Sequence, residues 1–324
     1  MIGIGIAALL AVAPQQPAPG ATHVLLVTGL SGEPRFATAF HAAAASIYDA
    51  AKSRWIASDS SLVFLAEDPA KDPARITGRA TREALAAALL KLGTRSAPGD
   101  VVLIVLIGHG SGQGADSRFN LPGPDATAAD FATWLTPLAG RTVALVNASS
   151  GSGDFVALLS AKDRIVVTAT KSAMERNEIT FFEHFAKAIT SEAGDADRDG
   201  RVTLLEAFGF ARREVAKGYQ TKNLLATEHA ILDDDGDGKG TAEPGASGDG
   251  ALARTVAFGI AALPSDPRVA VLVTERRALE AQVDALRRRK SSMDSTAYER
   301  ELERLLVEIA TKSAAIRAVT GPKP

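Results

Sequence analysis

The chain has 324 residues, a formal net charge of −2, 46% hydrophobic and 23% charged residues, and no cysteine. This composition is that of an ordinary globular protein, long enough to bury a substantial core in one large domain or two. The balanced charge gives no electrostatic basis for nucleic-acid binding, and the lack of cysteine excludes disulfides, thiolate metal sites and a cysteine nucleophile.

The first residues have the form of an export signal. Residues 2–12 are an apolar run too short to span a bilayer, and Ala11-Val12-Ala13 has the small-x-small pattern of a cleavage site. The positive charge that usually opens such a signal is absent. We expect residues 1–21 to be a signal peptide or disordered leader of an exported (periplasmic or secreted) protein with no stable membrane span. A hydrophobic tail on a cytoplasmic protein is the alternative.

Short apolar runs alternate with helical patterns over residues 22–265. Continuous apolar runs are typical of strands buried on both faces, and their alternation with helices predicts an α/β domain with a mostly parallel sheet. In such sheets the functional site lies beyond the carboxyl ends of the strands. We expect the third and fourth runs to be parallel neighbours. The runs are Val24–Thr28, Leu62–Ala66, Val101–Ile107, Thr142–Val146 and Ile165–Thr168, and the helical stretches lie near Ala37–Lys52, Arg82–Leu92, Ala128–Leu138 and Phe155–Leu159.

Glycine-rich turns with reactive side chains follow the third and fourth runs. The first turn contains His109 between two glycines, and the second, residues 147–154, contains Ser149 and Ser150. If the two strands are neighbours, a histidine base and a serine nucleophile meet at the edge of the sheet. The alternatives are a structural histidine and a serine–glycine loop that binds an anion through backbone amides.

The strongest motif is the twelve-residue segment Asp195–Glu206. A calcium-binding EF-hand loop takes carboxylates at positions 1, 3 and 5, glycine at position 6, a backbone carbonyl at position 7 and a bidentate glutamate at position 12. Helical spacing in Glu178–Glu192 and Leu204–Tyr219 completes a helix–loop–helix. A solvated acidic turn without an ion is the alternative. The ligand positions are Asp195, Asp197, Asp199, the Arg201 carbonyl, Thr203 and Glu206.

A second acidic run, Asp233–Gly240, begins in the same way. Asp233, Asp235 and Asp237 occupy positions 1, 3 and 5, but Pro244 stands where the closing glutamate belongs. Glycines and a proline after residue 240 prevent a following helix. The run predicts either a partial ion site or an exposed acidic loop.

Residues 266–324 carry two charged helical patterns. Thr274–Lys290 and Tyr298–Val319 have apolar residues at heptad-like spacing, and only Ser291–Ala297 separates them. We expect an antiparallel hairpin whose apolar face covers its own domain. Self-association through this face is the alternative.

The two reactive turns, in this order, resemble the legumain and caspase superfamily of cysteine peptidases. Members carry His-Gly after one strand and Ala-Cys-x-Ser-Gly after the next, and His109-Gly110 matches the first motif. Alignment on Ser152-Gly153 places Ser150 on the catalytic cysteine, whereas alignment on the preceding alanine places Ser149 there. Residues 167–178 and 226–230 also resemble the bacterial legumain-like branch, which carries an EF-hand insertion.

The resemblance implies a caspase-like three-layer sandwich over residues 22–265, with protein or peptide as substrate or partner. It implies His109 as the proton-transfer residue and Ser150, or Ser149, in the place of the nucleophile. Because serine replaces the family's thiolate, two functions stay open. One is a calcium-binding peptidase homologue that hydrolyses peptide bonds with serine and histidine. The other is an inactive homologue acting as a calcium-stabilised protein-binding module.

Overall fold

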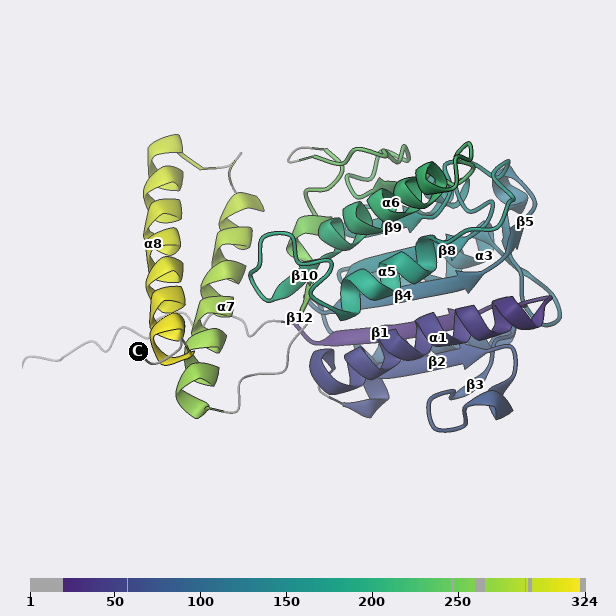
Figure 1. The fold of residues 1–324 in the computed structure, drawn as a ribbon, viewed down its shortest axis with the longest axis horizontal. Helices are drawn as coiled ribbons and strands as arrows, with labels where there is room; N and C mark the ends of the chain where they lie inside the picture. Colours follow the sequence, from purple (N-terminus) through teal and green to yellow (C-terminus); the bar gives the residue numbers. More distant parts are fainter. Residues whose placement is uncertain are drawn as a thin grey trace, which may run out of the picture.

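A seven-stranded sheet forms the centre of the molecule (Figure 1). The structure, a computed structural model, describes residues 20–56, 58–245, 248–259, 266–288, 290 and 293–320, so the expected leader lies almost wholly outside the described residues. The strand order is β11-β9-β8-β4-β1-β2-β3, and every pair is parallel except β11 with β9. The strands are β1 (Thr22–Thr28), β2 (Leu62–Ala66), β3 (Gly78–Arg79), β4 (Val101–Gly108), β8 (Thr142–Ser149), β9 (Arg164–Thr168) and β11 (Ile231–Asp233).

The predicted α/β class and mostly parallel sheet are confirmed. The third and fourth apolar runs are parallel neighbours, in register from Val101 opposite Thr142 to Gly108 opposite Ser149. β2 lies on one side of β1 and β4 on the other. The sheet therefore has a switch point between β1 and β4, where an open α/β sheet forms a crevice at its carboxyl edge.

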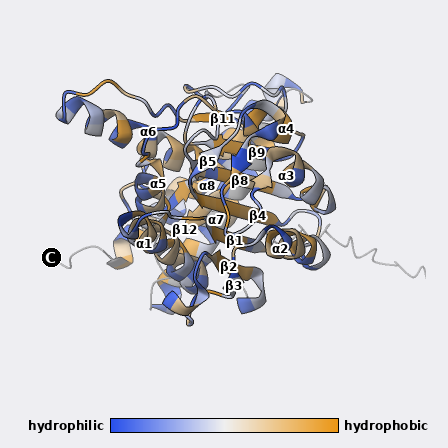
Figure 2. Cartoon of the chain, turned by 90° about the vertical axis from the view of Figure 1, so that its right-hand side faces the viewer, coloured by the Kyte–Doolittle hydropathy of each residue, from blue (hydrophilic) through white to orange (hydrophobic). Residues whose placement is uncertain are grey.

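Successive side chains of each central strand point to opposite faces of the sheet and belong to two separate hydrophobic clusters. In β4, Leu103 and Val105 join the cluster under α1, α5 and α6, whereas Val102 and Ile104 join the cluster under α2, α3 and α4. Both faces of the sheet are therefore covered, and the strands appear as a hydrophobic centre between two helical layers (Figure 2). The helices are α1 (Pro34–Ala50), α2 (Arg82–Arg95), α3 (Ala128–Trp134), α4 (Phe155–Leu159), α5 (Phe181–Thr190) and α6 (Leu204–Thr221).

Two small sheets and several short helical turns lie outside the central sheet. A three-stranded sheet follows β4, made of β5 (Gly110–Ser111), β6 (Arg118–Phe119) and β7 (Ala126–Thr127). A two-stranded sheet joins β10 (Arg201–Thr203) to β12 (Ala257–Gly259). The short helical turns are a π-helical turn at Ala51–Trp55 and 3-10 turns at Asp59–Ser61, Pro69–Lys71, Gly114–Asp116, Thr136–Leu138 and Ala253–Thr255.

The C-terminal helices α7 (Pro267–Arg288) and α8 (Ser295–Thr320) lie side by side as an antiparallel hairpin (Figure 1). Lys312 near the end of α8 forms an ion pair with Glu275 near the start of α7, at 2.7 Å. The apolar faces of the two helices pack on each other in a cluster of their own. Val283, Leu306 and Ile309 of the hairpin also line a cavity together with Leu205 and Ala257 of the main domain. Within the described ranges, no helix is both long and apolar enough to cross a bilayer.

Candidate functional site

The acidic segment Asp195–Glu206, called here the acidic loop, connects α5 to α6. Its middle forms β10, which pairs antiparallel with β12 and places the fully buried Val202 opposite Phe258. Trp55 supports β12 by packing on Phe258, with ring centroids 4.8 Å apart, and by donating to the Gly259 carbonyl at 2.8 Å. The back of the acidic loop is thus anchored to the main domain, while its carboxylates lie on the other side.

Backbone amides of the acidic loop donate to its own carboxylates. Asp195 accepts from the amides of Asp199 at 3.1 Å and Gly200 at 2.9 Å, and Asp199 accepts from the Arg201 amide at 2.7 Å. Positive φ angles of 60° at Arg198 and 84° at Gly200 make this tight turn, and glycine meets the second without strain. The chain therefore bends so that its first, third and fifth residues converge.

The converging carboxylates form a group with the dimensions of a metal site. Oxygens of Asp195, Asp197 and Asp199 all lie within 4.8 Å of one another, a group that could hold a metal ion. Burial first, and then the charge of Asp197, raises the pKa of Asp199 to about 6. Burial and the Glu206 charge also raise the pKa of Asp197. Burial and mutual repulsion thus make the charged form of these carboxylates unfavourable, and a bound cation would offset this electrostatic free energy.

Glu206 reaches back over the acidic loop from the first turn of α6. Its carboxylate accepts from the Thr203 amide and hydroxyl, both at 2.8 Å, while the Thr203 hydroxyl accepts from the Glu206 amide at 3.1 Å. This reciprocal capping box fixes the start of α6. The other carboxylate oxygen accepts from the Ala196 amide at 3.1 Å. The last carboxylate of the motif is thereby held beside its first residues.

The second acidic run is not simply an exposed loop. Asp233 is fully buried at the end of β11, and its carboxylate accepts from the Ser160 hydroxyl at 2.9 and 3.1 Å. Oxygens of Asp233, Asp235 and Asp237 also lie within 4.8 Å of one another, with the last two residues exposed. Asp249, far along the chain, accepts from the Asp234 amide at 2.9 Å. The run is a folded acidic turn with one buried carboxylate.

The turns after β4 and β8 lie against each other, as predicted. The Gly110 amide donates to the Ser150 hydroxyl at 3.3 Å, and a Cβ at Gly110 would overlap the Ser150 carbonyl oxygen. The ring of His109 packs edge-on against Phe36 and Phe40 of α1, with centroids 4.7 and 5.3 Å apart. The predicted juxtaposition of the two turns is therefore present.

The side chains of these turns are engaged elsewhere. The His109 Nε2 atom lies 3.2 Å from the Ser31 carbonyl oxygen, and the fully buried Ser149 donates to Asn147 at 2.7 Å. Ser150 is 3% exposed. Among the hydrogen bonds of the described residues, none joins the His109 ring to Ser149 or Ser150. A serine nucleophile needs a base that takes its proton, and the contacts of His109 in this structure are with Ser31 and α1.

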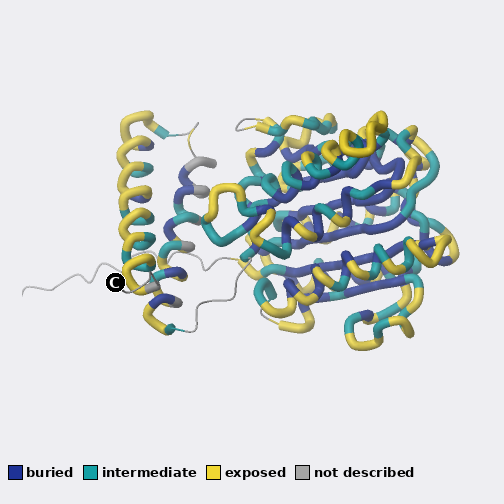
Figure 3. The backbone as a smooth tube through the Cα atoms, in the orientation of Figure 1, coloured by how far each residue is buried: buried dark blue, intermediate teal, exposed yellow. Residues whose placement is uncertain are grey.

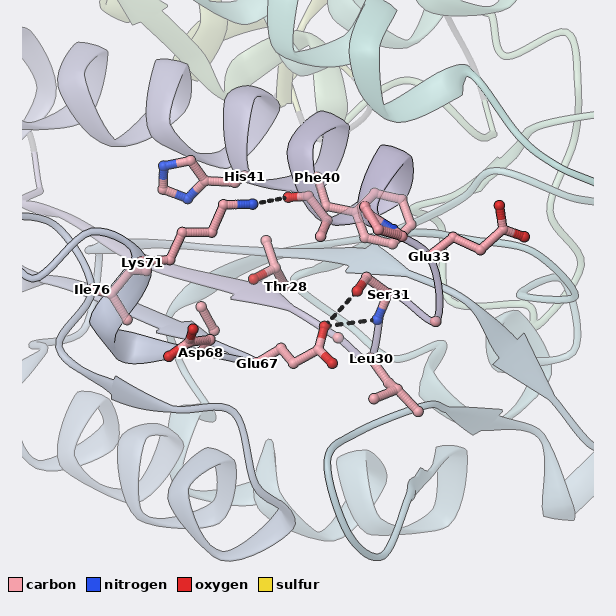
Figure 4. A pocket seen from close by; sticks show the side chains of 15 residues that line it. Thr28, Leu30, Ser31, Glu33, Phe40, His41, Glu67, Asp68, Lys71 and Ile76 are labelled. Carbon is pink, nitrogen blue, oxygen red and sulfur yellow. Dashed lines mark hydrogen bonds between the residues drawn. The ribbon is translucent and has the colours of Figure 1, made fainter.

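A pocket of about 540 Å³ lies at the carboxyl ends of β1 and β2 (Figure 4). His41 lines it, and His109 lies behind its wall, in contact with the lining residues Ser31 and Phe40. The Glu67 carboxylate accepts from the Ser31 amide at 3.0 Å and from its hydroxyl at 2.6 Å. Lys71 lines the same pocket and donates to the Ala37 carbonyl at 2.7 Å. Sequence reasoning missed this pocket, although Ser31 and Glu67 follow two predicted strands where the carboxyl-edge rule directs attention.

Glu228, in the segment 226–230, caps the start of α5 from a buried position. Its carboxylate accepts from the amides of Thr180 at 2.9 Å and Phe181 at 2.7 Å. The neighbouring His229 lies 2.5 Å from Glu175, through Nδ1 and Oε1. Burial raises the pKa of Glu228 from 4.5 to about 7, despite the amides that lower it.

This raised pKa predicts a pH-dependent stability. Between pH 4.5 and 7 the folded chain keeps a proton on Glu228 that the unfolded chain releases, so the free energy of unfolding falls as the pH rises through this window. The decrease is expected to be at most about 3 kcal/mol. Urea unfolding at a series of pH values in saturating calcium measures it, and Glu228→Gln is expected to flatten the profile. An equal slope in the variant would assign the effect to other groups.

No protein-family model and no curated protein matches this chain. Among solved structures it is similar to a Geobacter sulfurreducens protein determined as a structural-genomics target. That similarity has 13% sequence identity and a TM-score of 0.43, and it covers 65% of this chain and 92% of the other.

Proposed function

We propose that this protein is an exported, calcium-binding homologue of the legumain and caspase peptidases, with a caspase-like sandwich that binds protein or peptide without cleaving it. The observation that carries the calcium proposal is the hydrogen bonding of the acidic loop. Asp195 caps the turn at positions 5 and 6, and oxygens of Asp195, Asp197 and Asp199 lie within 4.8 Å of one another. Glu206 reaches back to the amide at position 2, beside this group.

These groups fit calcium better than a softer metal. Calcium takes six to eight oxygen ligands in flexible geometry, and the acidic loop offers oxygens only. Asp195, Asp197, Asp199 and Glu206 would hold the ion, together with the Arg201 carbonyl and Thr203. The ion would neutralise crowded carboxylates and fix the angle between α5 and α6, which stabilises the folded state by mass action.

The absence of hydrolysis is proposed from the state of the two serines. Ser149 is buried and its hydroxyl donates a hydrogen bond to Asn147. The Ser150 hydroxyl accepts a hydrogen bond from the Gly110 amide, which would otherwise be free to stabilise an oxyanion. His109 is held against α1 and the Ser31 carbonyl. Hydrolysis with Ser150 and His109 therefore requires these contacts to break first, and binding in the pocket lined by Ser31, His41 and Glu67 requires no such change.

We expect the wild-type protein to hydrolyse peptide substrates no faster than Ser150→Ala does, since neither serine has a base. Ser150→Cys is expected to react with thiol-directed peptide probes only slowly, because His109 is engaged elsewhere. The measurement is hydrolysis of a fluorogenic peptide mixture in calcium, with His109→Ala as the matched control. Wild-type activity that both Ser150→Ala and His109→Ala abolish would establish the hydrolase instead. Activity lost in Ser149→Ala alone would assign the nucleophile to Ser149.

A further inference from the structure

The C-terminal hairpin has a hydrophobic core of its own. Leu279, Val283 and Leu286 of α7 pack against Tyr298 and Leu305 of α8, and none of these residues belongs to the two clusters on the sheet. The tube view shows the hairpin beside the main domain, with exposed residues along α8 and with α7 nearer the sheet (Figure 3). No hydrophobic cluster of the described residues spans both parts, although apolar residues of both line one cavity. A change in the polar contacts between them can therefore shift the docking of the hairpin.

One polar contact joins the hairpin to the acidic loop. Arg276 on α7 donates through Nη2 to the backbone carbonyl of Asp199, and a Cβ at Gly200 would lie 3.7 Å from the same nitrogen. Glu280, one turn further along α7, lies 3.2 Å from the Arg276 Nε atom. The side chains of this pair are only 17% and 16% exposed. The hairpin thus touches the tight turn at positions 5 and 6 of the acidic loop.

The carboxylates of the acidic loop and the hairpin also share a cavity of about 370 Å³. From the main domain it is lined by Asp197, Asp199 and Glu206 together with the cations Arg201 and Arg254, and from the hairpin by Glu280, Val283, Leu306 and Ile309. A water molecule occupies about 30 Å³ of liquid, so the cavity has room for an ion with its bound waters. A change of charge in the acidic loop therefore changes the electrostatic environment of Glu280, which lines the same cavity.

We propose that calcium in the acidic loop controls the docking of the hairpin. This inference rests on the proposed calcium site. Without the ion, the loop carboxylates repel one another and Glu280, and the turn that presents the Asp199 carbonyl to Arg276 loosens. A divalent ion removes the repulsion and fixes the turn, so it favours the docked hairpin. By thermodynamic reciprocity the docked hairpin raises calcium affinity, by about tenfold for an ordinary coupling between sites.

The test measures docking and calcium binding separately in the full chain. Because the sequence contains no cysteine, Lys217→Cys on α6 and Ala310→Cys on α8 accept one spin label each. Pulsed EPR is expected to give one narrow distance distribution in calcium chloride and a broad one in EGTA. With Arg276→Ala added, the distribution is expected to be broad in both conditions.

Calorimetry with calcium chloride is expected to show about tenfold weaker binding to Arg276→Ala and no change in Arg300→Ala, a matched control at an exposed position of α8. Loss of the Arg276 cation removes a positive charge that repels calcium, and this effect alone would strengthen calcium binding. Weaker binding to Arg276→Ala therefore indicates that the docked state of the hairpin has been lost. Arg276→Lys, which keeps the charge, replaces the alanine variant if that one does not fold.

Identical distance distributions in calcium and EGTA, with calorimetry showing bound calcium, would overturn the coupling and leave the calcium site standing. Unchanged calcium affinity in Arg276→Ala would also overturn the coupling and leave the calcium site standing. If the wild-type protein binds no calcium, the proposed function fails and the coupling fails with it.

Discussion

Calcium is expected to raise the melting temperature of the wild-type protein, and Glu206→Gln is expected to abolish this rise. A calcium concentration a thousandfold above the dissociation constant stabilises the folded state by about 4 kcal/mol, which corresponds to a shift on the order of 10 °C for a domain of this size. The substitution removes one charge and the bidentate clamp at position 12. Glutamine still serves at this position of a capping box, so the start of α6 is retained and the variant without calcium is expected to melt near the wild type.

Glu243→Gln is the matched control for this experiment. Glu243 is an exposed carboxylate that pairs with Arg212 at 2.8 Å and lies outside the acidic loop, so its loss is expected to leave the calcium shift intact. Scanning calorimetry of the three proteins in calcium and in EGTA gives the comparison. A full calcium shift in Glu206→Gln would place the ion elsewhere, and Asp235→Asn and Asp237→Asn would then test the second acidic run.

The strands and the meeting of the two reactive turns could be predicted because their signals are local. Continuous apolar runs such as Val101–Ile107 need burial on both faces, and only a sheet between two helical layers provides it. Parallel pairing then brings the ends of β4 and β8 to the same edge of the sheet. The backbone positions of His109 and Ser150 are therefore close, independently of the side-chain conformations. The boundaries of α4 and the start of α6 were also predicted correctly, since a glycine-rich turn and a capping threonine mark them.

The partners of the individual side chains could not be predicted in this way. Whether His109 meets a serine hydroxyl or the Ser31 carbonyl depends on how its ring packs against α1, which the spacing of glycines does not record. The contact between Arg276 and Asp199 joins residues 77 positions apart. No periodicity within α7 distinguishes that arginine from other charged residues of the helix. Local patterns thus indicate elements, and long-range packing decides which functional groups meet.

Gly110→Ala is expected to destabilise the protein by about 3 kcal/mol. A Cβ at this position would overlap the Ser150 carbonyl oxygen and lie 3.0 Å from the Arg118 carbonyl oxygen and 3.2 Å from the Ser149 hydroxyl. Two of these neighbours are backbone atoms, so the turns after β4 and β8 must separate to accept the methyl group. Denaturant unfolding of the variant measures the loss through a lower midpoint at an unchanged slope.

Gly218→Ala is the control, and its expected effect has the opposite sign. Gly218 lies in α6 with no heavy atom within 4 Å of an added Cβ, so alanine there is expected to stabilise the helix by up to about 1 kcal/mol. If Gly110→Ala were instead as stable as the wild type, the two turns would not touch as the structure places them. A gap beside Ser150 would then be open to a substrate. Hydrolysis by Ser150 requires that closed contact to open, so the same measurement distinguishes an inactive binding protein from a serine hydrolase.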